Sequence, residues 1–141
     1  MPHPTLQAHA EIFEPNENIV VSGLEISYRE IYAKSSLIIS DYSSAVFDFA
    51  YLRKPIVYFQ FDSEEFFENG HVYTKGYFDY EKDGFGEVCY NLETLVDTII
   101  EYMKNDCRLK DKYRERINDF FAYNDKSNCQ RVYEEILKLG D

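Results

Sequence analysis

Residues Ser36 to Phe59 run SLIISDYSSAVFDFAYLRKPIVYF, and this stretch decides the expected fold. Leu37 to Ile39 is an apolar run of the kind that forms a buried strand. Ser43 to Arg53 carries apolar side chains around much of a helical circumference, which is typical of a helix packed on a sheet. Ile56 to Phe59 is a second apolar run. A strand, a helix and a strand in this order predict one right-handed crossover of a parallel sheet.

The same alternation extends toward the N-terminus. Ile19 to Ser22 is predicted to be a short buried strand, because turn formers precede it and Gly23 follows it. Ser27 to Ser35 is predicted to be a helix, with Ser27 as its N-cap and Glu30 at the capping-box position. Strands that are apolar on both faces are typical of sheets covered on both sides. We therefore expect an α/β fold, a Rossmann-like parallel sheet with helices on both faces.

The tetrapeptide DYSS lies where the central helix is expected to begin, at the carboxyl end of the preceding strand. A helix N-terminus has unpaired main-chain N–H groups and a partial positive charge, so anions bind there. Two adjacent hydroxyls beside these groups suit a diphosphate better than a simple cap requires. The candidate phosphate-binding residues are Asp41, Tyr42, Ser43 and Ser44. A capped helix without a ligand explains the tetrapeptide equally well when it is taken alone.

Two further residues are candidates for the same site. Asp48 lies four residues beyond Ser44 on a similar helix face, where a carboxylate can accept hydrogen bonds from ribose or glycerol hydroxyls. Taken by itself, Asp48 is better explained as an exposed helix carboxylate. His3 stands between two prolines that fix the backbone, and an imidazole can donate to a phosphate oxygen or act as a general acid. His9 and His71 lack partners at metal-ligand spacing, so no metal site is expected.

The part of the chain after Phe59 is less regular. Asp62 to Tyr80 is crowded with aromatic and acidic residues and is expected to form a long ordered loop beside the site. Glu87 to Tyr90 favours an edge strand, and Asn91 is the expected cap of the helix that follows it. The helices predicted to form the helical C-terminus are Leu92 to Lys104, about Leu109 to Phe121, and Ser127 to Leu139.

Composition limits the possible partners. With 141 residues, of which 45% are hydrophobic, a single domain over residues 1–141 is expected. The 15 Lys and Arg residues against 26 Asp and Glu give a net charge of -11, which repels nucleic acid. Three separated cysteines fit neither a disulfide framework nor a metal knuckle, and no apolar run reaches the roughly 20 residues of a membrane span. We expect a cytoplasmic domain without a cofactor, and the abrupt opening MPHP indicates a fragment of a longer protein.

Taken together, these motifs give the chain a specific resemblance. His3-Pro4 comes first, followed by LIISDYSS at Leu37 to Ser44, Phe47-Asp48, and KPI at Lys54 to Ile56. In this order they resemble the C-terminal, donor-binding half of the CDP-glycerol glycerophosphotransferase family, the bacterial teichoic acid primases and polymerases, which have a GT-B fold. The resemblance covers roughly Pro2 to Leu95.

The resemblance implies transfer of glycerol phosphate from CDP-glycerol to a hydroxyl of a lipid-linked acceptor, with release of CMP, in cell-wall teichoic acid synthesis. It also implies that Ser43, Ser44 and the catalytic His3 hold the donor pyrophosphate. In such enzymes an N-terminal domain is expected to carry the base toward the acceptor, and we expect that domain to lie outside these 141 residues. We therefore expect the isolated chain to bind donor weakly without catalysis, and the full-length protein to lie at the inner face of the cell membrane.

Other functions fit parts of the sequence. The donor-binding domain of a GT-B glycosyltransferase that uses a nucleotide sugar would carry a similar strand, turn and helix. A receiver-like signalling domain could use Asp41 as phosphoacceptor, but it needs an acidic cluster after the first strand and a lysine ending a late strand, whereas Lys54 precedes its strand. A non-catalytic interaction domain would leave the paired serines unexplained.

Overall fold

The computed structural model describes residues 9, 12–21, 26–68 and 76–139. The chain forms two compact units, Met1–Ser36 and Leu37–Asp141. The expectation of one domain over residues 1–141 stays a prediction.

In the first unit, helix α1 (Tyr28–Lys34) begins with the predicted capping box. The Glu30 main-chain N–H donates to Ser27 Oγ at 3.3 Å, and the Ser27 N–H donates to Glu30 Oε2 at 3.2 Å. Two of the N–H groups at this helix end are thereby satisfied, so the sequence signal located the helix start correctly.

The predicted strand from Ile19 to Ser22 is wrong where the structure describes it, and Ser22 lies outside the described residues. Asn16 and Ile19 instead form an isolated antiparallel bridge around a tight turn, in which the Asn18 N–H donates to Asn16 Oδ1 at 2.9 Å. Ile19 and Val20 are 52% and 82% exposed. An apolar run becomes a buried strand only when a neighbouring strand pairs with it, and this run turns back on itself.

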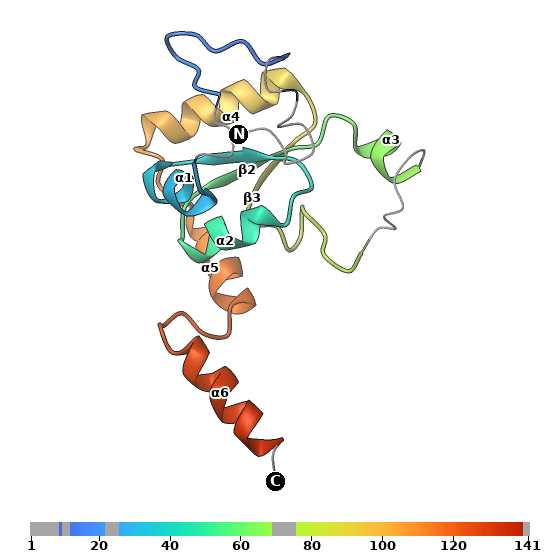
Figure 1. Ribbon diagram of the computed structural model, residues 1–141. Helices are drawn as coiled ribbons and strands as arrows, with labels where there is room; N and C mark the ends of the chain where they lie inside the picture. The colour runs from blue at the N-terminus through green and yellow to red at the C-terminus, as the bar shows by residue number, and fades with distance from the viewer. Residues whose placement is uncertain (1–8, 10–11, 22–25, 69–75, 140–141) are drawn as a thin grey trace. The chain divides into compact units, whose positions relative to one another are not determined.

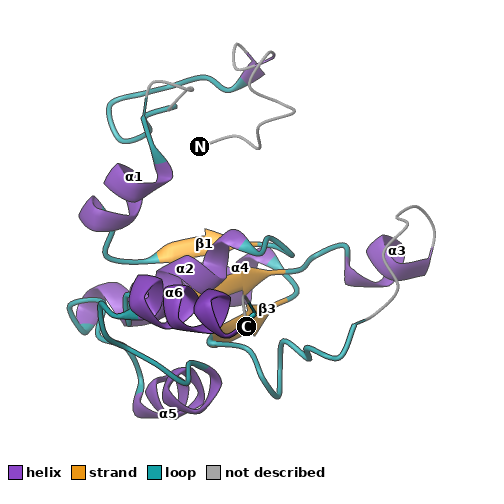
Figure 2. Cartoon of the chain, turned by 60° about the horizontal axis from the view of Figure 1, so that its bottom comes forward, coloured by secondary structure: helices purple, strands orange, loops and turns teal. Residues whose placement is uncertain are grey.

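The second unit contains the parallel sheet, built from β1 (Ile38–Ser40), β2 (Ile56–Phe59) and β3 (Gly86–Cys89) in the order β1-β2-β3. Figures 1 and 2 show the strands side by side. Ile38 pairs with Ile56, and Ile56 pairs with Gly86. The edge strand that was expected at Glu87 to Tyr90 thus forms one residue earlier. The expected parallel α/β sheet is confirmed.

Helices cover both faces of this sheet, as predicted. Helix α2 (Ala45–Tyr51) contacts β1 and β2, whereas α4 (Leu92–Lys104) contacts β2 and β3 from the opposite side (Figure 1). Asn91 caps α4 as expected, because its side chain accepts a hydrogen bond from the Thr94 N–H at 2.9 Å. The core residues between α4 and the sheet are Val57, Cys89, Leu95 and Tyr102.

Helices α5 (Asp111–Phe120) and α6 (Asn128–Lys138) form the helical C-terminus. Arg116 on α5 donates to the carbonyl oxygens of Gly84 at 2.8 Å and Glu81 at 2.9 Å, and thereby fixes the segment that precedes β3. An aromatic cluster joins this segment to α2 and to the end of α5. Each of its rings lies 5.0–6.3 Å, centroid to centroid, from at least two others, and the rings belong to Phe47, Phe78, Phe85, Phe120 and Phe121.

The stretch from Asp62 to Tyr80 is not loop throughout, because it contains helix α3 (Ser63–Glu68). Residues 69–75 of this stretch lie outside the described residues. The first turn of α3 carries two glutamates, whose negative charge is favourable at a helix N-terminus. Figures 1 and 2 both show α3 beyond the carboxyl end of β2, which is the edge of the sheet that carries the candidate site.

Candidate functional site

The DYSS turn connects the carboxyl end of β1 to α2, where the sequence predicted it. Ser43 Oγ accepts a hydrogen bond from the Ala45 N–H at 3.3 Å. Ser44 already has a helical backbone conformation, with φ -66° and ψ -15°, and its side chain makes no capping bond. Capping therefore accounts for Ser43 but not for Ser44.

Exposure separates the candidate residues into two groups. Asp41, Ser44 and Asp48 are exposed, whereas Tyr42 and Ser43 are partly buried. The Ser44 hydroxyl is thus available to a ligand from solvent. The Ser43 hydroxyl can still donate its proton, because its contact with Ala45 uses the oxygen as acceptor.

Tyr42 joins the turn to the segment that begins α3. Its hydroxyl donates to Asp62 Oδ1 at 3.1 Å. Its ring stacks on Phe66 with centroids 3.8 Å apart and an interplanar angle of 14°, and the Tyr80 ring lies nearly perpendicular to it with centroids 6.1 Å apart. Burial, followed by the hydrogen bond to Asp62, raises the pKa of Tyr42. Tyr42 therefore stays neutral and acts as a donor at physiological pH.

Sequence reasoning missed Gln60, which follows β2 directly and is only 4% exposed. Its side-chain Nε2 points to the main-chain oxygen of Asp41 at 3.5 Å, and its own main-chain N–H donates to Cys89 O at 2.9 Å. The available signal was a polar residue immediately after the apolar run IVYF, at the carboxyl edge where ligands bind in α/β sheets.

The structure does not bring all the predicted site residues together. His3 and His71 lie outside the described residues, so the placement of His3 in the site stays a prediction. Asp48 lies on α2, one turn beyond Ser44.

Among the residues that the structure describes, no three His, Cys, Asp or Glu side chains are grouped as metal ligands would be. No helix within the same ranges has the length and apolarity needed to cross a bilayer.

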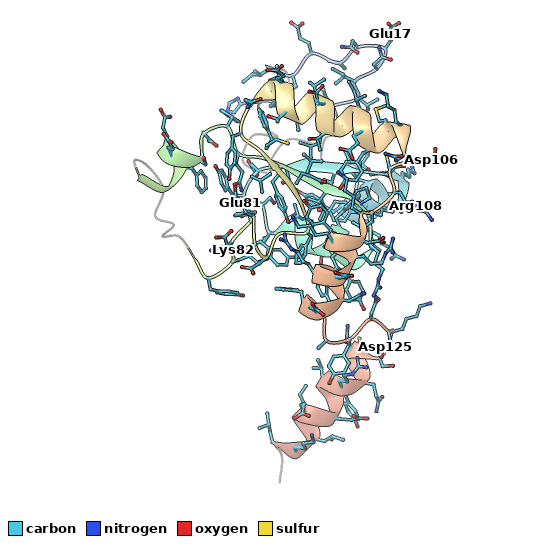
Figure 3. All side chains as sticks on the ribbon, turned by 180° about the vertical axis from the view of Figure 1, so that it is seen from behind. Glu17, Glu81, Lys82, Asp106, Arg108 and Asp125 are labelled. Atoms are coloured by element: carbon cyan, nitrogen blue, oxygen red, sulfur yellow. The ribbon has the colours of Figure 1, made fainter. Side chains whose placement is uncertain are left out.

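A cavity of about 520 Å³ lies away from the DYSS turn, between the C-terminal end of α4 and the start of α5. Figure 3 shows Asp106 and Arg108 at this end of α4. Lys110, which lines this cavity, is already paired, because its Nζ contacts Glu87 Oε1 at 2.7 Å and Glu101 Oε1 at 2.9 Å. We interpret this region as a structural ion-pair network that links Lys110, which precedes α5, to Glu87 on β3 and Glu101 on α4.

The parallel sheet, its two helical layers and the hydroxyl-rich turn at its carboxyl edge define a Rossmann-like α/β domain. The model of the CDP-Glycerol:Poly(glycerophosphate) glycerophosphotransferase family matches residues 1–138. The chain belongs to this family, as the sequence motifs had indicated.

Individual relatives agree with this assignment. The minor teichoic acid biosynthesis protein GgaB of Bacillus subtilis (strain 168) is 42% identical over 140 residues, which are 99% of this chain and 15% of GgaB. The teichoic acid poly(glycerol phosphate) polymerase of Bacillus spizizenii (strain ATCC 23059 / NRRL B-14472 / W23) is 33% identical over 112 residues, which are 77% of this chain and 26% of the polymerase.

A solved structure of the wall teichoic acid polymerase TagF has a similar fold, with a TM-score of 0.64. The two chains are 23% identical, and the match covers 93% of this chain and 32% of TagF. This similarity confirms the Rossmann-like fold expected from the sequence. The chain spans roughly a seventh to a third of the length of these proteins.

Proposed function

We propose that this domain binds the pyrophosphate of CDP-glycerol, or of a related nucleotide donor, for teichoic acid synthesis. The observation that carries the proposal is the exposed Ser44, which no capping role explains, at the carboxyl edge of the sheet in a glycerophosphotransferase-family chain. Ligands of open α/β sheets bind at this edge. The reaction would transfer glycerol phosphate to a hydroxyl of a lipid-linked acceptor and release CMP.

In this proposal the turn stabilises the charge that develops on the leaving phosphate. The hydroxyls of Ser43 and Ser44 donate to phosphate oxygens, and the partial positive charge at the start of α2 adds to their effect. Asp48 accepts hydrogen bonds from the ribose or glycerol hydroxyls. His3 donates to the pyrophosphate or protonates the leaving group.

The remaining parts of the enzyme would supply the acceptor side of the reaction. The relatives are several times longer than this chain, and we assign the base and the acceptor groove to those additional regions. Contact with the lipid-linked acceptor at the inner face of the membrane would also involve them. The chain alone should therefore bind donor without catalysing transfer.

The test is a titration of the 141-residue chain with CDP-glycerol and with CMP, followed by NMR of the main-chain amides. We expect shifts concentrated between Asp41 and Asp48 at millimolar ligand. Ser43→Ala combined with Ser44→Ala should abolish them. Ser127→Ala is the matched control. Like Ser44, Ser127 is an exposed serine at the start of a helix, and its side chain makes no capping hydrogen bond.

Two outcomes would contradict parts of the proposal. If the amides of Asp41 to Asp48 do not respond to millimolar CDP-glycerol, the site is wrong. If a UDP-sugar displaces CDP-glycerol at lower concentration, the site stands but the donor is a nucleotide sugar.

A further inference from the structure

Gln60 is exceptional because it is a buried amide at the edge of a largely apolar sheet. Among the residues that the structure describes, and leaving tyrosines aside, it is the only polar residue that is buried. Burying an amide is unfavourable unless hydrogen bonds replace those made to water. An apolar side chain would fill this position at lower cost, so stability does not explain the glutamine.

The contacts of Gln60 place it where three segments meet. Its main-chain N–H donates to Cys89 O at the end of β3, and its main-chain oxygen accepts from the Ser63 N–H at the start of α3 at 3.3 Å. Its side chain reaches the third segment, where Nε2 faces the main-chain oxygen of Asp41 after β1. Gln60 is thus fixed by its backbone while its amide faces the DYSS turn.

The hydrogen-bonding capacity of this amide is largely unused. The contact from Nε2 to Asp41 O is 3.5 Å, which is at the outer limit of a hydrogen bond. An amide has two N–H donors and one acceptor oxygen, and among the described residues the side chain has no other partner. Hydrogen bonds in sites without ligand are often long and shorten when the ligand binds.

We propose that Gln60 is a positioning residue of the donor site. Its amide holds the main chain of Asp41, and through it the hydroxyls of Ser43 and Ser44, in the orientation that binds the donor phosphates. The Tyr42 hydroxyl donates to Asp62, which lies two residues after Gln60 in the chain. The turn is therefore held at two consecutive residues, Asp41 and Tyr42. This inference rests on the proposed donor binding.

The experiment compares the 141-residue chain with its Gln60→Met variant, which removes the amide but keeps an unbranched side chain of similar volume. We expect the affinity for CDP-glycerol to fall about three- to tenfold, as the loss of one net hydrogen bond predicts. The thermal midpoint should stay the same or rise, because a buried polar group is replaced by an apolar one. Gln130→Met is the matched control, since Gln130 is exposed on α6.

If Gln60 acts by orienting the serines, the effects of substituting Gln60 and Ser44 on affinity should depend on each other. In a Ser44→Ala background, Gln60→Met should weaken binding by less than about twofold, because the orientation of the turn then matters less. Without ligand, the amide resonances of Tyr42 to Ala45 should already shift in Gln60→Met. Gln60→Glu provides a second variant, in which an acceptor replaces the Nε2 donor, and it should weaken binding as well.

The outcomes distinguish this inference from the proposed function. If the unsubstituted chain does not bind CDP-glycerol, the proposed function fails and this inference fails with it. If that chain binds and Ser44→Ala weakens binding, but Gln60→Met and Gln60→Glu do not, only the inference is wrong. A lower thermal midpoint with unchanged affinity would make Gln60 a packing residue and would also overturn it.

Discussion

Tyr42 is the residue that makes the candidate site more than a capped helix. Its backbone belongs to the turn, while its ring and hydroxyl are held by Phe66 and Asp62 from a segment about twenty residues later in the chain. The turn is therefore supported on the side that faces α3. Supporting contacts of this kind keep ligand-binding groups in place before the ligand arrives.

Replacing Tyr42 by phenylalanine tests this support. Tyr42→Phe keeps the stacked ring but removes the hydroxyl that donates to Asp62, so we expect a loss of about 0.5–1.5 kcal/mol in the free energy of unfolding. Urea denaturation followed by circular dichroism measures it. Tyr77→Phe is the control, because Tyr77 is 93% exposed. Equal stability of the two variants would show that the bond to Asp62 contributes nothing.

The sequence located the serine turn but not its support. Ser43 and Ser44 follow an apolar run and precede a helical pattern, and local spacing is enough to place them. The contacts of Tyr42 with Phe66 and of Gln60 with Asp41 join separate segments, and no local pattern encodes them. Their prediction requires the order of the strands and the path of the chain after β2.

At the level of secondary-structure elements, sequence analysis placed helix starts correctly where a capping side chain determines them. The capping box at Ser27 and the cap at Asn91 lie at the predicted helix starts. The run from Ile19 to Ser22 failed because strand formation depends on a partner, and α3 was missed because its acidic and aromatic residues lack a clear helical stripe.

Gly86 shows how closely two strands approach each other in this sheet. A Cβ atom on Gly86 would clash with the carbonyl oxygen of Ile56 on β2, so a side chain there forces the strands apart. We expect Gly86→Ala to destabilise the fold by at least ~2 kcal/mol, measured by urea denaturation. Gly76→Ala is the matched control, because among the described residues no atom beyond its two chain neighbours lies within 4 Å of its added Cβ. If both variants unfold at the same urea concentration, the close approach of β2 and β3 is wrong.

At the scale of the whole molecule, the tyrosines make stability depend on alkaline pH. Burial raises the pKa of Tyr58, Tyr80 and Tyr102, and it raises that of Tyr113 to about 12. In the unfolded chain these hydroxyls ionise near pH 10. The folded state thus holds their protons more tightly than the unfolded chain does. The resulting contribution to the free energy of unfolding is complete below pH 10 and is lost as the pH rises through the folded-state pKa values.

We therefore expect the chain to unfold cooperatively at alkaline pH. Each such tyrosine lowers the free energy of unfolding by up to about 1.4 kcal/mol per pH unit between pH 10 and its folded-state pKa. The measurement follows tyrosinate absorbance and circular dichroism together as pH is raised from 9 to 12.5. Tyr58, Tyr102 and Tyr113 should ionise only as the helices unfold, so the rise in their tyrosinate absorbance should coincide with the loss of the circular dichroism signal. Ionisation of all tyrosines near pH 10 with an unchanged circular dichroism spectrum would contradict the packing of these rings around the sheet.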